Sequence, residues 1–216
     1  SSVKVSALVV SSKRGEHLIE CLNHLSTQIV NFDFEIAVWD ILNDQNKRDI
    51  LQSLFSGVRD FSQEEGDPLP TAFFRALDKL KGDYILLLSD DILLHQDAVD
   101  KLHHAAMGLP DRHVFFPRID WQKRNFFGWG KRKFSLKSKQ LITKALGRTN
   151  VFSYKTFKED KARWVYSECF FAHRNSFFYR DFISREQTQK NLFLWKYRKP
   201  APIFRYVSEV VVFKKE

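Results

Sequence analysis

The chain has 216 residues, 44% of them hydrophobic, which is enough for one α/β domain with a sizeable core and too few for two. Two cysteines are too few for a disulfide framework or a metal site, and no stretch has the form of a signal peptide or the ~18 apolar residues that span a bilayer. The formal net charge is +9, and residues 122–148 hold this whole excess, with nine Lys and Arg and no Asp or Glu. We therefore predict a single domain over residues 1–216, cytoplasmic or peripheral at the cytoplasmic face of a membrane. Because the chain begins without an initiator methionine, an anchor outside this sequence is left open.

Strand-like and helix-like segments alternate through the first half of the chain. Apolar strands are predicted over Val3–Val10, Phe34–Trp39, Tyr84–Leu88 and His113–Pro117. Amphipathic helices are predicted after Gly15 and over Lys47–Leu54, Thr71–Leu80 and Asp97–Met107, with an exposed loop over Ser62–Pro70. Regular alternation of this kind is typical of a parallel sheet with right-handed crossovers.

The second half of the chain is less regular. We predict a strand over Glu168–His173, a short helix over Asn175–Phe182, a longer helix over Gln187–Tyr197 and a closing strand over Arg205–Phe213. The basic segment, residues 122–148, separates these elements from the first half.

The acidic pair Asp90-Asp91 comes directly after the apolar run Tyr84–Leu88 and Ser89. That run is apolar on both alternating faces, as in a central parallel strand covered by helices on both sides. Ligands of open α/β sheets bind at the carboxyl ends of such strands, where two carboxylates can hold a divalent cation against a diphosphate. Taken alone, the pair also fits a solvated strand end or a helix cap.

Three stretches of the first half resemble family 2 glycosyltransferases, which have the GT-A fold. Val5–Gln28 resembles the opening of that family, Glu35–Asp40 its second strand, and Lys81–Leu102 its DXD-like motif with the flanking strand and helix. The resemblance is good over residues 3–107, disappears over 110–163 and returns weakly to the C-terminus. It implies an α/β fold, a GT-A-like, Rossmann-related, mostly parallel sheet flanked by helices. Residues 3–109 would then bind a nucleotide sugar, and residues 110–216 would form the acceptor side.

The same resemblance implies a function and a donor site. The expected enzyme is an inverting, hexosyltransferase-like protein of polysaccharide biosynthesis that moves one sugar from a nucleoside-diphosphate sugar, with UDP favoured, to a glycan or lipid-linked acceptor. The residues implied to contact the donor are Ser11, Lys13, Arg14, Asp40, Ser89, Asp90 and Lys214. Asp91, with Asp90, would hold Mg²⁺ or Mn²⁺, since these ions suit carboxylate and phosphate oxygens and stabilise a leaving diphosphate.

Several residues depart from the family pattern and keep alternatives open. Ser89 replaces the first acid of the DXD motif, Ile41 replaces an acid that follows the second strand, and Gln187 replaces an acid near the base. Because three acids of the family pattern are missing, a non-catalytic domain that binds a nucleotide or a glycan is the alternative. Asp40 could instead cap a strand-to-loop turn. Lys214 stands where the family often has a histidine; it either contacts phosphate or is a solvated lysine.

Inversion requires a carboxylate that accepts the proton of the acceptor hydroxyl. By the resemblance, Glu186 in Ser184–Gln187 is the catalytic base, with Asp181 and Glu168 as reserve candidates. The alternative for Glu186 is a structural acid at a helix N-terminus, where the helix dipole favours it.

The basic segment, residues 122–148, also contains four aromatic residues, Phe126, Phe127, Trp129 and Phe134. Such a mixture is typical of contact with an anionic membrane surface, and it also fits an anionic glycan or a solvated loop. A nucleic-acid-binding module is a further alternative. It would leave the first half of the chain unexplained, so no nucleic-acid partner is expected.

Overall fold

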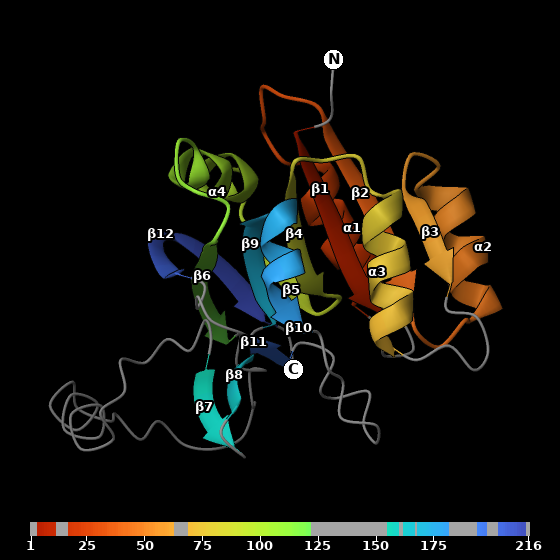
Figure 1. Ribbon diagram of the computed structural model, residues 1–216. Coiled ribbons are helices and arrows are strands. Elements are labelled where there is room, and N and C mark those ends of the chain that lie inside the picture. The colour runs from red at the N-terminus through yellow and green to blue at the C-terminus, as the bar shows by residue number, and fades with distance from the viewer. Residues whose placement is uncertain are drawn as a thin grey trace, which may run out of the picture.

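The computed structural model describes residues 4–11, 17–62, 69–121, 155–159, 162–166, 168–181, 194–197 and 203–214. Its main feature is an eight-stranded sheet with helices on both faces (Figure 1). The strands of the first half are β1 (Val5–Ser11), β2 (Phe34–Asp40), β3 (Arg59–Ser62), β4 (Tyr84–Ser89), β5 (Ile92–Leu94) and β6 (His113–Trp121). The helices are α1 (Leu18–Ser26), α2 (Gln45–Leu54), α3 (Leu69–Lys79) and α4 (Ala98–Ala106).

The main sheet has the strand order β3-β2-β1-β4-β9-β6-β12-β5, where β9 is Cys169–His173 and β12 is Ile203–Lys214. Strands β3, β2, β1 and β4 are parallel, and β6 is parallel to β12, whereas β9 and β5 run antiparallel to their neighbours. The chain moves outward from β1 to β2 and β3 and then returns to β4 on the other side of β1. This reversal makes the space between the carboxyl ends of β1 and β4 the topological switch point of the sheet.

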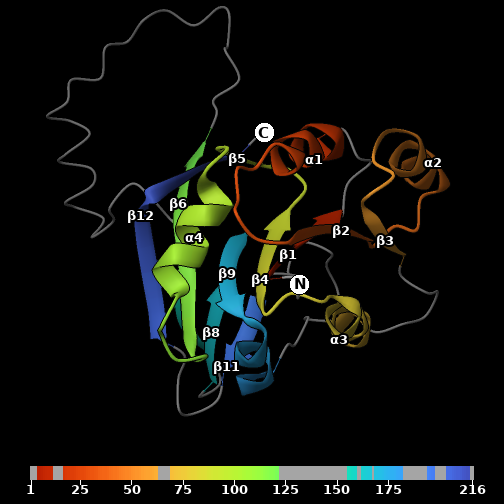
Figure 2. The ribbon, with the colours of Figure 1, turned by 90° about the horizontal axis from the view of Figure 1, so that it is seen from above.

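Both faces of the sheet are covered, as the continuous apolar strands predict. Along β1, Val5, Ala7 and Val9 pack with α1, α4 and one residue of α2, while Leu8 and Val10 pack with α3 on the opposite face. Figure 2 shows α1 and α3 on opposite sides of β1. Two hydrophobic layers therefore fix the strands and with them the positions of the strand ends.

The second half adds a small antiparallel sheet. It has the order β10-β11-β8-β7, formed by β10 (Arg180–Asp181), β11 (Leu194–Tyr197), β8 (Ala162–Tyr166) and β7 (Lys155–Glu159). A 3₁₀ helix, η1 (Arg174–Tyr179), connects β9 to β10. In Figure 1 the small sheet lies below the main sheet, on the side at which β1 and β2 end.

The predicted elements of the first half are confirmed with small shifts, and those of the second half less well. The helix predicted over Gln187–Tyr197 is wrong for its last four residues, which form β11 and pair with β8. Leu, Trp and Tyr in this short run suit a strand, and so short an apolar run cannot be assigned by periodicity alone. The predicted loop over Ser62–Pro70 ends earlier, because α3 begins at Leu69.

Helix length gives one further result. Within the described ranges, no helix is both long and apolar enough to cross a membrane.

Candidate donor site

Polar residues end the three central parallel strands, and these strand ends lie together at one edge of the sheet. Ser11 ends β1 and Asp40 ends β2, and the two are paired in the strand register. Ser89 ends β4, where it is paired with Val10 of β1. All three side chains are buried. The sequence-predicted cluster is therefore assembled at the switch point, where α/β sheets bind their ligands.

The acidic turn Asp90-Asp91 is tied directly to β1. The Ser11 hydroxyl donates a hydrogen bond of 2.9 Å to Asp90 Oδ2, and the Asp90 backbone N–H donates to the carbonyl of Val10 at 3.2 Å. Both carboxylates are about 1% exposed. The hydrogen bonds fix the turn between β4 and β5, and they explain why a serine ends β1.

Asp40 organises the loop after β2. Its Oδ1 accepts from Lys47 Nζ at 2.9 Å and from the backbone N–H of Leu42 at 3.2 Å, and its Oδ2 accepts from the backbone N–H of Asp44 at 2.6 Å. Both members of the Asp40–Lys47 ion pair are buried. These contacts match the alternative in which Asp40 caps a strand-to-loop turn. A contact between Asp40 and the donor nucleotide stays a prediction.

Lys214 lies beside the acidic turn, because the end of β12 pairs with β5. Its register partner is Ile92, the residue after Asp91. Lys214 Nζ is 3.8 Å from Asp91 Oδ2 and makes a closer ion pair with Glu168 Oε1. The lysine side chain is 11% exposed. It is therefore not the solvated lysine that the sequence left open.

Glu168 reaches the site through an antiparallel strand. The Ser89 backbone N–H donates to the Glu168 carbonyl at 3.0 Å, immediately before β9 pairs with β4. The sequence indicated Glu168 only as a reserve base, and it gave no signal for the buried Lys47. A lysine in an amphipathic helix is expected at the solvent face unless its partner is known.

The described carboxylates do not form a metal centre around Asp91. Over the ranges that the structure describes, no group of three or more His, Cys, Asp or Glu side chains is placed to hold a metal ion. A cation bound to Asp91 Oδ2 at about 2.1 Å would also lie within about 6 Å of the Lys214 ammonium. At an effective dielectric constant of 20, a divalent ion at that distance would be repelled by roughly 5 kcal/mol. The Lys214 ammonium therefore competes with the predicted Mg²⁺ or Mn²⁺ for the Asp91 carboxylate.

The two cysteines lie in the core and remain free thiols. Burial, with a smaller contribution from the nearby Asp90 carboxylate, raises the pKa of Cys21 well above its usual value. Burial also raises the pKa of Cys169. Both therefore contribute to packing and not to nucleophilic chemistry.

Other predicted site residues fall outside what the structure describes. Lys13, Arg14 and Glu186 lie in ranges that it does not describe, as does the basic segment, residues 122–148. The backbone of Asp181 belongs to β10, but its side chain is not described. Their assigned roles stay predictions.

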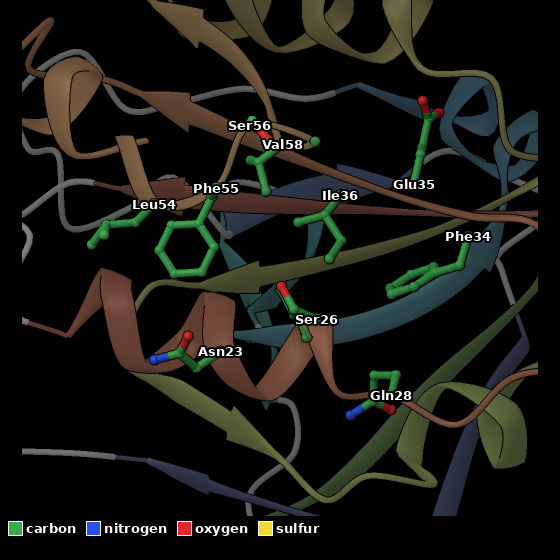
Figure 3. Close-up of a pocket in the computed structure, with 12 residues that line it drawn as sticks. Asn23, Ser26, Gln28, Phe34, Glu35, Ile36, Leu54, Phe55, Ser56 and Val58 are labelled. Atoms are coloured by element: carbon green, nitrogen blue, oxygen red, sulfur yellow. The ribbon is translucent and has the colours of Figure 1, made fainter. Parts of the chain in front are cut away.

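A pocket of about 620 Å³ lies elsewhere, at the opposite end of β2. Figure 3 shows Phe34 and Ile36 of β2 with Phe55, above the helix that carries Asn23 and Ser26. Because these β2 residues begin the strand that Asp40 ends, the pocket is separate from the acidic turn.

The arrangement of the sheet is that of GT-A glycosyltransferases. The crystal structure of GalNAc-T7 with UDP, GalNAc and Mn²⁺ superposes with a TM-score of 0.59 at 14% identity, over 100% of this chain and 44% of that chain. The crystal structure of S. aureus TarS 1-349 gives a TM-score of 0.58 at 13% identity, over 99% of this chain and 60% of that chain. The chain thus spans less than two thirds of either protein, and at these identities the likeness shows the fold alone.

The sequence itself settles the family. The model of the family described as Glycosyl transferase family 2 matches residues 6–187, and the chain belongs to this family. The resemblance drawn from the strand and DXD-like motifs is confirmed. The search of curated proteins found no match.

Proposed function

We propose that this domain is a glycosyltransferase that binds a nucleoside-diphosphate sugar, with UDP favoured, between the carboxyl ends of β1 and β4. The observation that carries the proposal is the buried acidic turn at the switch point, held to β1 by Ser11, in a chain of glycosyl transferase family 2. The UDP and GalNAc in the GalNAc-T7 structure support a donor of this class.

The proposed reaction is a single displacement with inversion. A carboxylate accepts the proton of the acceptor hydroxyl while that oxygen attacks the anomeric carbon, and the bond to the diphosphate breaks with its electron pair leaving on the diphosphate. Glu186 is proposed as this base, because the reserve candidate Glu168 is engaged by Lys214. The acceptor is proposed to be a glycan or a lipid-linked glycan.

The Mn²⁺ in the GalNAc-T7 structure supports the predicted Mg²⁺ or Mn²⁺, whereas the ammonium of Lys214 beside Asp91 opposes it. When bound, such an ion would neutralise charge on the diphosphate. No step of the reaction above depends on it.

The membrane contact remains a proposal based on composition. The basic segment, residues 122–148, would bring the domain to an anionic membrane surface at the cytoplasmic side, where a lipid-linked acceptor is found. Cosedimentation with vesicles containing phosphatidylserine at low salt tests this contact, and no cosedimentation would contradict it.

Thermal unfolding with a panel of nucleoside diphosphates and their sugars tests the donor site. A ligand at one hundred times its dissociation constant adds ~2.7 kcal/mol to stability, which for a domain of this size is a shift of roughly 5 to 10 °C. We expect such a shift with one base. A domain that gives no shift with any base would not be a nucleotide-sugar enzyme.

Two chemically identical substitutions, one before and one after β4, then distinguish an effect on the site from an effect on the fold. Asp91→Asn changes the carboxylate at the carboxyl end of β4, and we expect it to abolish sugar transfer. Asp83→Asn changes an exposed carboxylate just before β4, where it pairs with Lys4 at 3.5 Å, and we expect no loss. If the wild type binds the donor but neither transfers nor hydrolyses it, the non-catalytic alternative suggested by Ser89 and Gln187 is correct.

A further inference from the structure

We propose that Lys214 is the built-in cation of the donor site, which binds the diphosphate directly and takes the place of a divalent metal ion. This inference rests on the proposed function and adds to it how the charge of the donor is neutralised.

The position of Lys214 is fixed by long-range strand pairing. The last residues of β12 pair with β5 on one side and with β6 on the other, and the pairing places Lys214 opposite Ile92. Lys214 therefore reaches the acidic turn from a strand whose backbone is hydrogen-bonded on both sides. A flexible C-terminal lysine would not be held in this way.

Two carboxylates orient the ammonium. Glu168 contacts Nζ closely, and Asp91 Oδ2 lies 3.8 Å from it, in a site where both acids are at least four-fifths buried. In so buried a site, a metal ion at Asp91 would have to compete with the Lys214 ammonium, which the protein chain already holds there. Asp91 thus has a cation beside it before any ligand arrives.

The chemistry of an ammonium group suits the binding of a diphosphate. Lysine offers three N–H donors and a compact positive charge, which is a common way for proteins to bind phosphate. A phosphate oxygen at Nζ would form a charge-assisted hydrogen bond, and Glu168 and Asp91 act as positioning residues for the lysine.

The experiment compares binding in the presence and absence of metal. Calorimetry of the wild-type domain with UDP, GDP, ADP, CDP and dTDP is done in EDTA and in MnCl₂, and electron paramagnetic resonance follows the binding of MnCl₂ alone. We expect one diphosphate to bind in EDTA with an affinity within about threefold of that in MnCl₂, and no tight site for Mn²⁺.

A second set of binding measurements uses substitutions of Lys214. Lys214→Met should weaken that diphosphate in EDTA by about tenfold or more, because a charge-assisted hydrogen bond is lost, and should leave the affinity for the nucleoside unchanged. Lys214→Arg should retain most of the affinity. Lys4→Met, at the amino end of β1, removes the same charge from an exposed site and should change nothing.

Three results would overturn the inference: diphosphate binding that requires MnCl₂ in the wild type, a tight site for Mn²⁺ alone in the wild type, and unchanged diphosphate affinity in Lys214→Met. The wild-type measurements need no variant, so they decide the question even if Lys214→Met fails to fold. If no diphosphate binds under any condition, the proposed function itself is wrong, and this inference falls with it.

Discussion

At the scale of single residues, the site contains buried polar side chains that have hydrogen-bond or ion-pair partners. The Ser11 hydroxyl is matched to Asp90, the Lys47 ammonium to Asp40, and the Lys214 ammonium to Asp91 and Glu168. A buried charge is tolerated only when such a partner is present. The partners therefore matter to the stability of the site as well as to its chemistry.

Removing Lys47 should destabilise the domain strongly. Lys47→Met leaves the buried Asp40 carboxylate with backbone donors alone, and we expect a loss of about 3 kcal/mol in the free energy of unfolding. Urea denaturation measures it. The control is Lys101→Met, which breaks an exposed pair with Asp97 and should cost less than about 1 kcal/mol. Equal losses of free energy in the two variants would show that the buried ion pair stabilises the domain no more than an exposed one.

Glu35 should make the domain sensitive to acid. Burial raises the pKa of Glu35, but hydrogen bonds from Ser6, the Lys81 backbone and Arg59 lower it further, so its pKa lies below the ordinary 4.5. Because the pKa of Glu35 is lower in the folded than in the unfolded protein, its carboxylate stabilises the fold at pH values above the unfolded-state pKa. This contribution is lost as the pH falls below about 4.5. Glu35→Gln should therefore flatten the fall of Tm between about pH 5 and pH 3. Parallel Tm curves for the two proteins would contradict this.

At the scale of elements, the close contact between the residue before β4 and strand β1 sets the position of the acidic turn that follows β4. Gly82 precedes β4 and approaches β1 so closely that a Cβ there would lie 2.5 Å from both the backbone nitrogen and the hydroxyl of Ser6. The Gly82 N–H also donates to that hydroxyl at 2.7 Å. Close contact at this point sets the register in which β4 carries Ser89 alongside Val10.

Gly82→Ala should consequently destabilise the domain. The atoms in the way belong partly to the backbone of β1 and cannot rotate aside, so we expect a loss of about 2 to 3 kcal/mol. Gly57→Ala is the matched control, because a Cβ at Gly57 meets nothing within 4 Å, and it should stay within about 0.5 kcal/mol of wild type. Chemical denaturation of the pair tests this, and a Gly82→Ala variant as stable as Gly57→Ala would refute it.

At the scale of the whole molecule, one hydrophobic layer connects the donor site to the rest of the fold. Cys21 of α1 and Cys169 of β9 both belong to the core on the α1 side of the sheet. Because these thiols are buried and their pKa values are raised, each becomes reactive only when the core opens. Their labelling therefore reports the unfolding of the molecule as a whole.

Donor binding should slow this labelling. A diphosphate at one hundred times its dissociation constant lowers the unfolded fraction about one-hundredfold, and the labelling rate of both thiols should fall by the same factor. Measuring the reaction with an aromatic disulfide, with and without ligand, tests this. If either thiol reacts rapidly in the folded protein, the core opens locally, and the prediction is wrong.

The sequence by itself determined the features that depend on local pattern. The apolar run Tyr84–Leu88 predicted a buried strand that ends beside Asp90 and Asp91, and the alternation of strands and helices predicted a parallel sheet with right-handed crossovers. Family membership followed from the same stretches and was confirmed over residues 6–187. These predictions succeeded because burial on two faces and the direction of parallel strands leave few alternatives.

Only the tertiary structure decided which charges meet. Lys214 and Glu168 lie far from Asp91 in the sequence, and they reach it because β12 pairs with β5 while β9 enters the sheet antiparallel to β4. In the same way, the burial of Lys47 follows from its ion pair with Asp40, which the helical pattern of the sequence does not show. The free energy of an ion pair depends on distance and burial, and neither quantity can be read from residues that become neighbours only through long-range strand pairing.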